Sequence, residues 1–171
     1  MAQKFNDYVN EKKLVDLHKA ISDGNVEKYW GNGLSYDGKD IFDVYMKNYD
    51  DIKSEIKMDF EDTSGISDFS GQEVYLGYDK KKDEFISGWD CWITEEIDNP
   101  DFDMDDEDSY EDEFIEEDSS ANASVRFKIS NGKVKIVDTI TWTGDIFYQA
   151  KGNEGYNAIK KNSDIIDIRL D

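Results

Sequence analysis

Histidine and cysteine are nearly absent from this sequence of 171 residues, which contains one of each, His18 and Cys91. A single cysteine cannot form an internal disulfide, and it excludes a zinc site built from several thiolates. A single histidine excludes every mechanism or metal centre that needs a pair of imidazoles. The neighbours of Cys91 are apolar and no base is evident to activate it, so we predict that Cys91 packs in the core and is not a nucleophile.

Long apolar runs are also missing. No segment approaches the roughly 20 apolar residues needed to span a membrane. The charged stretch at residues 1–13 is not followed by the apolar region of a secretory signal. We therefore expect a soluble, cytoplasmic protein, and we attribute the glycosylation-like sequence Asn122-Ala123-Ser124 to chance.

Basic residues are missing from one part of the chain. The whole chain has 41 acidic and 20 basic residues, a net charge of −21. The segment Glu95–Asp118 contains 15 Asp or Glu and no Lys or Arg, which leaves 26 acids and 20 bases elsewhere, a net charge of only −6. Nine Phe, ten Tyr and four Trp supply enough large side chains for a hydrophobic core. The sequence therefore predicts a mildly acidic domain with one strongly acidic segment.

The first third of the chain has the spacing of helices. Apolar residues recur every three or four positions from Phe5 to Ile21, as in an amphipathic helix. The turn residues Ser22–Gly24 end this helix and precede a short helix over Asn25–Trp30. A third helix is predicted over Asp40–Ile52.

After Ser54 apolar and polar residues alternate, which is typical of strands with one buried face. The predicted strands are 54–61, 74–78, 85–94, 125–129 and 133–142. The turn Asn131-Gly132 favours a tight hairpin between the last two strands. Helices followed by antiparallel strands indicate an α+β fold. Residues 143–171 have no clear period, apart from a final short strand within 164–171, and we expect them to form an extension packed on or near the sheet.

Three stretches are similar to one known fold. Residues 21–49 resemble its short second helix, glycine-containing turn and third helix, residues 54–60 ("SEIKMDF") resemble its first main strand, and residues 123–142 resemble its closing hairpin. This fold is that of the nuclear transport factor 2-like superfamily, which includes ketosteroid isomerases and polyketide cyclases. The resemblance covers about residues 5–142. It implies N-terminal helices packed on a curved antiparallel sheet that forms a cone-shaped pocket, and dimerisation through the outer sheet face. Two features depart from the family's pattern, an acidic insertion at about residues 97–121 and the extension past Trp142.

One spacing in the acidic segment matches a calcium loop. Asp101, Asp103, Asp105, Ser109 and Asp112 fall at positions 1, 3, 5, 9 and 12 of an EF-hand-like loop. The match lacks the glycine needed at position 6 and the longer glutamate needed at position 12. The four aspartates are therefore a weak calcium candidate, and no other cofactor is expected.

Two further interpretations of the acidic segment remain open. Its carboxylates can stand in for phosphates and occupy the groove of a nucleic-acid-binding protein. Alternatively, the segment is a solvated loop between neighbouring strands, kept extended by self-repulsion. The loop is favoured, because the segment shows no helical or strand period and a mimic needs charges ordered on a rigid surface.

Asp138, Tyr29 and His18 are the candidates for a site inside the pocket. Counting by twos along residues 134–142 places Asp138 on the apolar face of its strand, where burial would raise the pKa of its carboxyl group and suit it to proton transfer. Tyr29 or His18 would then donate a hydrogen bond to the substrate. The alternatives are a bulge that shifts the register of Asp138, a hydrogen bond from Asp138 to a tyrosine such as Tyr29, and a place in the core for His18.

Three classes of function are compatible with the sequence. The first is a non-catalytic binding or assembly module, whose outer sheet face and acidic loop meet a protein partner that is basic in charge. The second is a small-molecule isomerase, dehydratase or cyclase that uses the pocket carboxylate on a hydrophobic ligand. The third is an inhibitor that mimics nucleic acid, such as a phage protein directed at a nuclease. The first is favoured, because no two polar groups stand at a spacing that defines a catalytic pair, and no direct contact with nucleic acid or membrane is expected.

Overall fold

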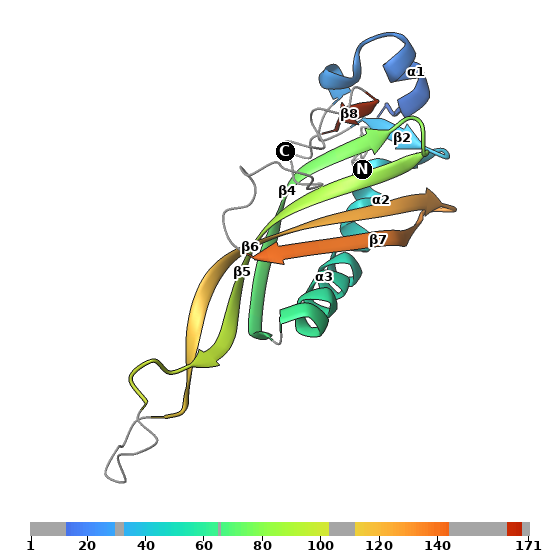
Figure 1. Cartoon of the computed structure of the whole chain (residues 1–171). Helices are drawn as coiled ribbons and strands as arrows, with labels where there is room; N and C mark the ends of the chain where they lie inside the picture. The colour runs from blue at the N-terminus through green and yellow to red at the C-terminus, as the bar shows by residue number, and fades with distance from the viewer. Residues whose placement is uncertain (1–12, 30–32, 65, 103–111, 144–163, 169–171) are drawn as a thin grey trace, which may run out of the picture.

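The computed structural model describes residues 13–29, 33–64, 66–102, 112–143 and 164–168. It contains a large antiparallel sheet, a small sheet at one end, and few helices (Figure 1). The predicted α+β class is therefore confirmed. Among the helices in these ranges, none has the length and apolar character needed to cross a membrane.

The first described segment forms the small sheet and two short helices. Its elements are β1 (Val15–Asp16), α1 (Leu17–Ser22), η1 (Val26–Tyr29), β2 (Leu34–Tyr36) and β3 (Lys39–Asp40). β2 pairs in parallel with β1 and antiparallel with β3. The Asp16 side chain accepts a hydrogen bond from the backbone N–H of Lys19, which fixes the start of α1.

The predicted N-terminal helices are confirmed in part. The short helix at Asn25–Trp30 is present as the 3₁₀ helix η1. The prediction of a longer helix from Phe5 to Ile21 is wrong at residues 13–16, because α1 begins only at Leu17. Residues 5–12 lie outside the described residues. The third predicted helix is divided in two, α2 (Ile41–Lys47) and α3 (Tyr49–Ser64). The Asp40 carboxylate accepts hydrogen bonds from two backbone N–H groups at the start of α2.

α3 corrects the prediction of a strand over residues 54–61. Ile52, Ile56 and Phe60 are fully buried and stand four positions apart, which places them on one face of a helix. Met58, which a strand would bury together with Ile56 and Phe60, is 48% exposed. The stretch that resembles the first main strand of the nuclear transport factor 2-like fold is therefore helical.

The large sheet contains five strands in the order β7-β6-β5-β4-β8, and all neighbours are antiparallel. The strands are β4 (Ile66–Asp79), β5 (Glu84–Asp98), β6 (Phe114–Ser130), β7 (Lys133–Thr143) and β8 (Ile165–Asp167). The strands predicted at 74–78, 85–94, 125–129 and 133–142 are confirmed, and β4, β5 and β6 extend well beyond the predicted bounds. The short strand suggested within 164–171 is present as β8.

The turn between β6 and β7 confirms the Asn131-Gly132 signal. Asn131 has a φ of 53° and Gly132 a φ of 73°. Both values lie in the left-handed region, which type I′ hairpin turns require and which asparagine and glycine adopt most readily. Ser130 and Lys133 pair across the turn, so the hairpin closes directly beside it.

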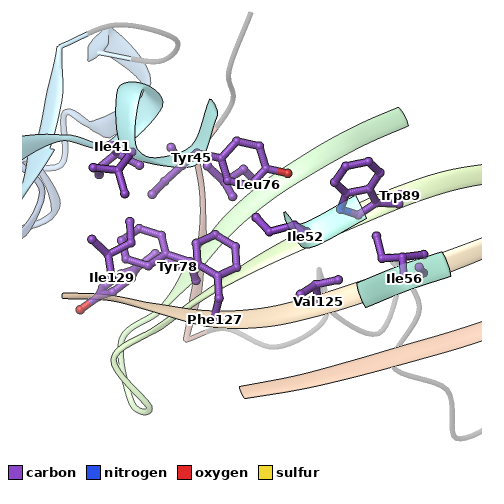
Figure 2. Packing of buried hydrophobic residues seen from close by; sticks show 14 of the residues in the cluster. Ile41, Tyr45, Ile52, Ile56, Leu76, Tyr78, Trp89, Val125, Phe127 and Ile129 are labelled. Carbon is purple, nitrogen blue, oxygen red and sulfur yellow. The ribbon is translucent and has the colours of Figure 1, made fainter. Parts of the chain in front are cut away.

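The main core lies between one face of the large sheet and the helices α2 and α3 (Figure 2). We call this the inner face. Trp89 of β5 and Phe127 of β6 are fully buried there, together with Tyr45 of α2 and Ile52 of α3. The rings of Tyr45 and Phe127 lie 5.8 Å apart, which joins α2 to the sheet. The aromatic residues that the composition shows in excess are therefore used in packing.

The outer face of the sheet is partly covered by β8. Tyr75 of β4 and Ile86 of β5 are buried on this face and pack against Ile165. The Tyr75 hydroxyl donates a hydrogen bond to Asp167 Oδ1 at 3.0 Å. This second apolar cluster holds the C-terminal strand against the sheet.

Candidate functional site

β5 and β6 continue past the rest of the sheet as a two-stranded hairpin, which we call the acidic hairpin (Glu95–Asp118). Figure 1 shows its strands projecting away from the body of the protein. The first residue of β4, Ile66, lies opposite Glu95. Beyond Glu95 only β5 and β6 remain paired. Residues 95–98 and 114–118 are strands, although the sequence shows no strand period there; residues 103–111 lie outside the described residues.

Like charges face each other in this hairpin. Glu95 pairs with Glu117, and Glu96 pairs with Glu116. Like charges directly opposite one another destabilise a sheet. The next pair, Ile97 with Ile115, is apolar and provides a favourable cross-strand contact that offsets part of the repulsion.

Hydroxyl groups orient two of the hairpin carboxylates. The Ser67 hydroxyl donates to Glu116 Oε1 at 3.1 Å, and the Thr94 hydroxyl donates to Asp118 Oδ1 at 2.7 Å. Neither donor carries a charge. These hydrogen bonds therefore position the carboxylates without neutralising them, and the negative charge stays available at the surface.

Apolar side chains are exposed on the acidic hairpin and at its base. Trp92, at its base on the outer face of β5, is 62% exposed, and Phe114 and Ile115 are 45% and 39% exposed. A groove of about 320 Å³ beside Trp92 is lined by residues of three strands, including Asp68 and Asp118. The acidic hairpin thus combines carboxylates with accessible aromatic surface.

Two of the four calcium candidates, Asp101 and Asp112, are described, and both are exposed. Asp103 and Asp105 lie outside the described residues. The Asn99 amide donates to the backbone carbonyl of Asp112 at 2.8 Å, and its side-chain oxygen accepts from the Asp101 N–H at 3.0 Å. In the part of the chain that the structure describes, no three His, Cys, Asp or Glu side chains are grouped so that they could hold a metal.

Asp138 lies on the outer face, which corrects its prediction as a buried pocket carboxylate. Arg126 pairs with Asp138, but the next residue, Phe127, pairs with Ile136, so Val137 is an extra residue in β7. One extra residue reverses the alternation of side chains between the two faces. Of the alternatives derived from the sequence, the register-shifting bulge is therefore correct.

Tyr29 and His18 do not meet Asp138. Tyr29 is partly buried against the main core, on the other side of the sheet from Asp138. His18 is exposed on α1, which corrects the prediction of a core histidine. Its ring lies 5.6 Å from the ring of Tyr36 and 5.8 Å from the ring of Tyr78. The three predicted residues therefore do not form one site.

Glu73 is an inward-facing carboxylate that sequence reasoning missed. It pairs with Trp89 on the inner face, and a bulge at Val74 separates it from Tyr75 on the outer face. Burial raises the pKa of Glu73 to about 7, against a smaller lowering by a hydrogen bond from the Tyr75 backbone. The Glu73 backbone N–H lies 3.5 Å from the hydroxyl oxygen of Tyr49. A carboxyl group with such a pKa can donate or accept a proton at neutral pH.

Tyr45 lies close to Glu73 inside the core. Burial raises the pKa of Tyr45, the negative charge of Glu73 raises it further, and the hydroxyl of Ser87 lowers it. Among the described residues, the Tyr45 hydroxyl has no hydrogen-bond partner in good geometry, although it is fully buried. A carboxyl group and a buried phenol are therefore held near each other between α2 and the sheet.

A cluster of Tyr36, Tyr78 and Asp83 fixes the turn between β4 and β5. The hydroxyls of Tyr36 and Tyr78 both donate to Asp83 Oδ1, each at 2.6 Å. These hydrogen bonds hold the pKa of Asp83 below its usual value, and burial raises the pKa of both tyrosines. Because both hydroxyls are engaged, the cluster joins β2 to the β4–β5 turn and serves the fold.

Arg126 neutralises two buried carboxylates on the outer face. Its Nη1 atom lies 3.3 Å from Asp79 Oδ2 and 3.8 Å from Glu84 Oε2. Both carboxylates are buried. Cys91 is also buried, which confirms its predicted core position, and burial raises the pKa of its thiol to about 12.

Comparison of the chain with known proteins gives no match to a family model, to a curated protein or to a solved structure. The likeness to the nuclear transport factor 2-like superfamily therefore rests on the sequence resemblance alone. Within the described residues, the acidic hairpin and the pair of Glu73 and Tyr45 depart most from what packing requires.

Proposed function

We propose that the protein is a non-catalytic binding module whose acidic hairpin engages a strongly basic surface of a protein partner. The observation that supports this most is the pairing of Glu95 with Glu117 and of Glu96 with Glu116 in ordered strands. Like-charged pairs lower stability, and such local conflicts are expected where function requires them. A cationic partner would neutralise the opposed glutamates, so binding would also remove the repulsion that destabilises the hairpin.

The distribution of charge supports a basic partner. The segment 95–118 holds 15 acidic residues, whereas the rest of the chain has a net charge of −6. The described strands of this segment project from the body of the protein, so their carboxylates carry a negative potential away from it. Such a potential speeds the encounter with a positive surface and disfavours direct contact with nucleic acid. Trp92, Phe114 and Ile115 add exposed apolar area, which protein interfaces use as anchors.

Neutralising the hairpin tests the proposal. The variant E95Q/E96Q/E116Q/E117Q removes both pairs of opposed glutamates and keeps side chains of the same size. Its affinity for an oligolysine peptide, measured by calorimetry at low salt, should fall by about tenfold or more, since exposed ion pairs contribute about 0.2–1 kcal/mol each.

A matched control removes the same charge elsewhere. The variant E27Q/D37N/D43N/D50N neutralises acidic residues that are exposed and lie outside the hairpin, away from its base. It should keep the affinity of the unaltered protein within about twofold, because charges beyond a Debye length of the bound peptide are largely screened. Equal losses in both variants would show that net charge alone attracts the peptide. An unaltered protein that does not bind the peptide would contradict the proposal.

The nucleic-acid mimic is a special case of this proposal, in which the basic surface is a groove that otherwise holds phosphates. Duplex DNA should then compete with the protein for the partner, because both occupy the same positive groove. A basic partner that binds this protein and DNA at the same time would exclude the mimic and leave the general proposal standing.

Glu73 favours a second candidate function, proton transfer on a small hydrophobic molecule. In this proposal the substrate displaces part of the packing beside Glu73, where the nuclear transport factor 2-like resemblance implies a cone-shaped pocket. Glu73 takes the role predicted for Asp138, and Tyr45 donates a hydrogen bond to the substrate. The support for it is the inward direction of Glu73, its pKa near 7 and the buried Tyr45 hydroxyl.

Proton exchange on simple carbonyl compounds tests this second candidate. Exchange of the protons next to the carbonyl of cyclic ketones for deuterium, followed by NMR, should be faster with the protein than in buffer. E73Q should abolish the acceleration, whereas E96Q, an exposed matched control, should keep it. No acceleration by the unaltered protein across such a panel would contradict the candidate.

A further inference from the structure

Trp92 stands on the outer face of the sheet in a frame of carboxylates. The strand registers define three rows across β4, β5 and β6, which are Asp68–Thr94–Asp118, Ser70–Trp92–Ser120 and Gln72–Asp90–Asn122. Alternate residues of a strand share a face, so the residues of these rows lie on the same face as Trp92. Each row next to Trp92 therefore contributes at least one carboxylate.

The indole ring is bare because its cross-strand neighbours are small. Ser70 and Ser120 flank Trp92 on either side, and neither side chain is large enough to cover an indole. Among the large hydrophobic residues that the structure describes, Trp92 is the most exposed. An aromatic ring exposed on a sheet face, rather than packed, is available for stacking with a planar cation.

The carboxylates are within reach of a group stacked on this ring. Directly opposed side chains in a sheet have Cβ atoms about 4.5–5.5 Å apart, and diagonal neighbours about 7–8 Å. Asp118 and Asp68 are diagonal neighbours of Trp92 and line the same groove of about 320 Å³. The hydrogen bond from Thr94 holds Asp118 in place. A planar cation on the indole could therefore be bound from its edge by Asp118 or Asp68.

We propose that Trp92 and these aspartates bind an arginine side chain of the basic partner, with the guanidinium stacked on the indole and hydrogen-bonded to Asp118 or Asp68. This inference rests on the proposed function, because the acidic hairpin supplies the attraction and the Trp92 site supplies a specific contact. Arginine fits better than lysine, since its planar guanidinium stacks on an aromatic face and donates two parallel hydrogen bonds to a carboxylate. An ammonium group does neither.

The surface next to the site fits a protein segment rather than free arginine. Along the same face, Glu96 and Glu116 form the second row beyond Trp92, and Phe114 lies opposite Asp98 in the row after that. At about 3.3 Å per residue this face runs for about 20 Å from Trp92. An extended basic segment could therefore place one arginine at Trp92, further cations over the glutamates and an apolar residue at Phe114.

Arginine and lysine peptides of equal length and charge test the inference. The full-length protein should bind oligoarginine about two- to fivefold more tightly than oligolysine, which is the expected contribution of stacking at an exposed aromatic ring. W92A should bring this ratio to about one, and W92F should keep part of it because a phenyl ring still stacks. V137A, a change at an exposed apolar residue of β7, should leave both affinities unchanged. Calorimetry gives the affinities, and circular dichroism confirms the fold of each variant.

The possible failures are distinguishable. If the unaltered protein binds neither peptide, the proposed function fails and the inference with it. If it binds both with equal affinity, or if W92A keeps the preference for arginine, the Trp92 site is wrong while the basic partner stands. D118N provides a second variant, because loss of the edge contact should reduce the ratio even if W92A does not fold.

Discussion

Glu96 on β5 lies directly opposite Glu116 on β6, in a hairpin segment without a single basic residue. The strands stay paired because the backbone hydrogen bonds and the neighbouring Ile97–Ile115 pair outweigh a repulsion that water and salt screen. We therefore expect the order of the hairpin to depend on its ionic surroundings.

Reversing one of these charges should stabilise the hairpin. In E116K the repulsion with Glu96 is replaced by attraction, worth about 0.5–1 kcal/mol for a cross-strand pair. Amide hydrogen exchange in residues 95–98 should therefore slow by about two- to fivefold at low salt, and the effect should shrink at high salt. E116Q should give a smaller change, and equal effects of the two variants would show that the glutamates do not interact.

Arg126 and Asp138 should respond very differently to substitution, although they are cross-strand neighbours. R126M leaves Asp79 buried without its cation and Glu84 with only Lys128 at 3.9 Å, and should lower the free energy of unfolding by about 3 kcal/mol. D138N changes an exposed group and should stay within about 0.5 kcal/mol. Urea denaturation measures the free energy of unfolding of both variants. A larger effect of D138N than of R126M would show that the bulge at Val137 is misplaced.

The sequence indicated the parts of the fold that have a strong local signal. Asn131-Gly132 indicated the β6–β7 hairpin because few residues adopt its backbone angles. The strand at 54–61 was wrong because Ile56 and Phe60 fit a period of two as well as a helical period. Ile52, one turn before Ile56, belongs to the same helical face. The segment is a helix because this face packs against the sheet.

The candidate site was harder to predict, because two bulges change which face a carboxylate occupies. Alternation along β4 groups Val74 with Leu76 and Tyr78, which would leave Glu73 facing outward. The bulge at Val74 turns Glu73 inward, and the bulge at Val137 turns Asp138 outward. Neither bulge has a glycine or another sequence signal at the extra residue, so counting by twos placed Asp138 on the wrong face.

The Asp83 cluster should contribute to stability at neutral pH. D83N keeps a side chain that tolerates the φ of 54° but replaces the charged acceptor of Tyr36 and Tyr78, so we expect a loss of about 1–2 kcal/mol. The folded-state pKa of Asp83 lies below 3.8, so this contribution is complete above that pH and is lost as the pH falls through the folded pKa. Thermal unfolding of D83N and the unaltered protein should therefore converge in acid.

D37N is the matched control for this prediction. Asp37 is exposed and also has a positive φ, of 50°, so the backbone demand is the same at both positions. Its substitution should change the free energy of unfolding by less than about 0.5 kcal/mol. If D37N and D83N lower stability equally, the turn conformation and not the tyrosine hydrogen bonds would explain the effect.

Glu73 should make the protein less stable as the pH rises towards neutrality. Its pKa is 4.5 when unfolded and about 7 when folded, so between these values the folded state binds more protons than the unfolded state. The free energy of unfolding should therefore fall as the pH rises from 4.5 to 7, and the cost of the buried charge is fully present above 7. E73Q carries no charge to bury, and above pH 7 it should be more stable than the unaltered protein by about 1–2 kcal/mol, allowing for partial exposure of the carboxylate.

The pH dependence of this difference separates burial from general charge repulsion. Removing any one of the many carboxylates reduces repulsion within the chain, so E96Q, an exposed variant of the same chemistry, is measured alongside E73Q by urea denaturation. The gain of E73Q should vanish below pH 4.5, where Glu73 is protonated in both states, and it should exceed the gain of E96Q above pH 7. A variant E73Q that is less stable at every pH would instead mean that the carboxylate makes a hydrogen bond the amide cannot replace. In that case Glu73 would be a structural acceptor rather than a group available for proton transfer.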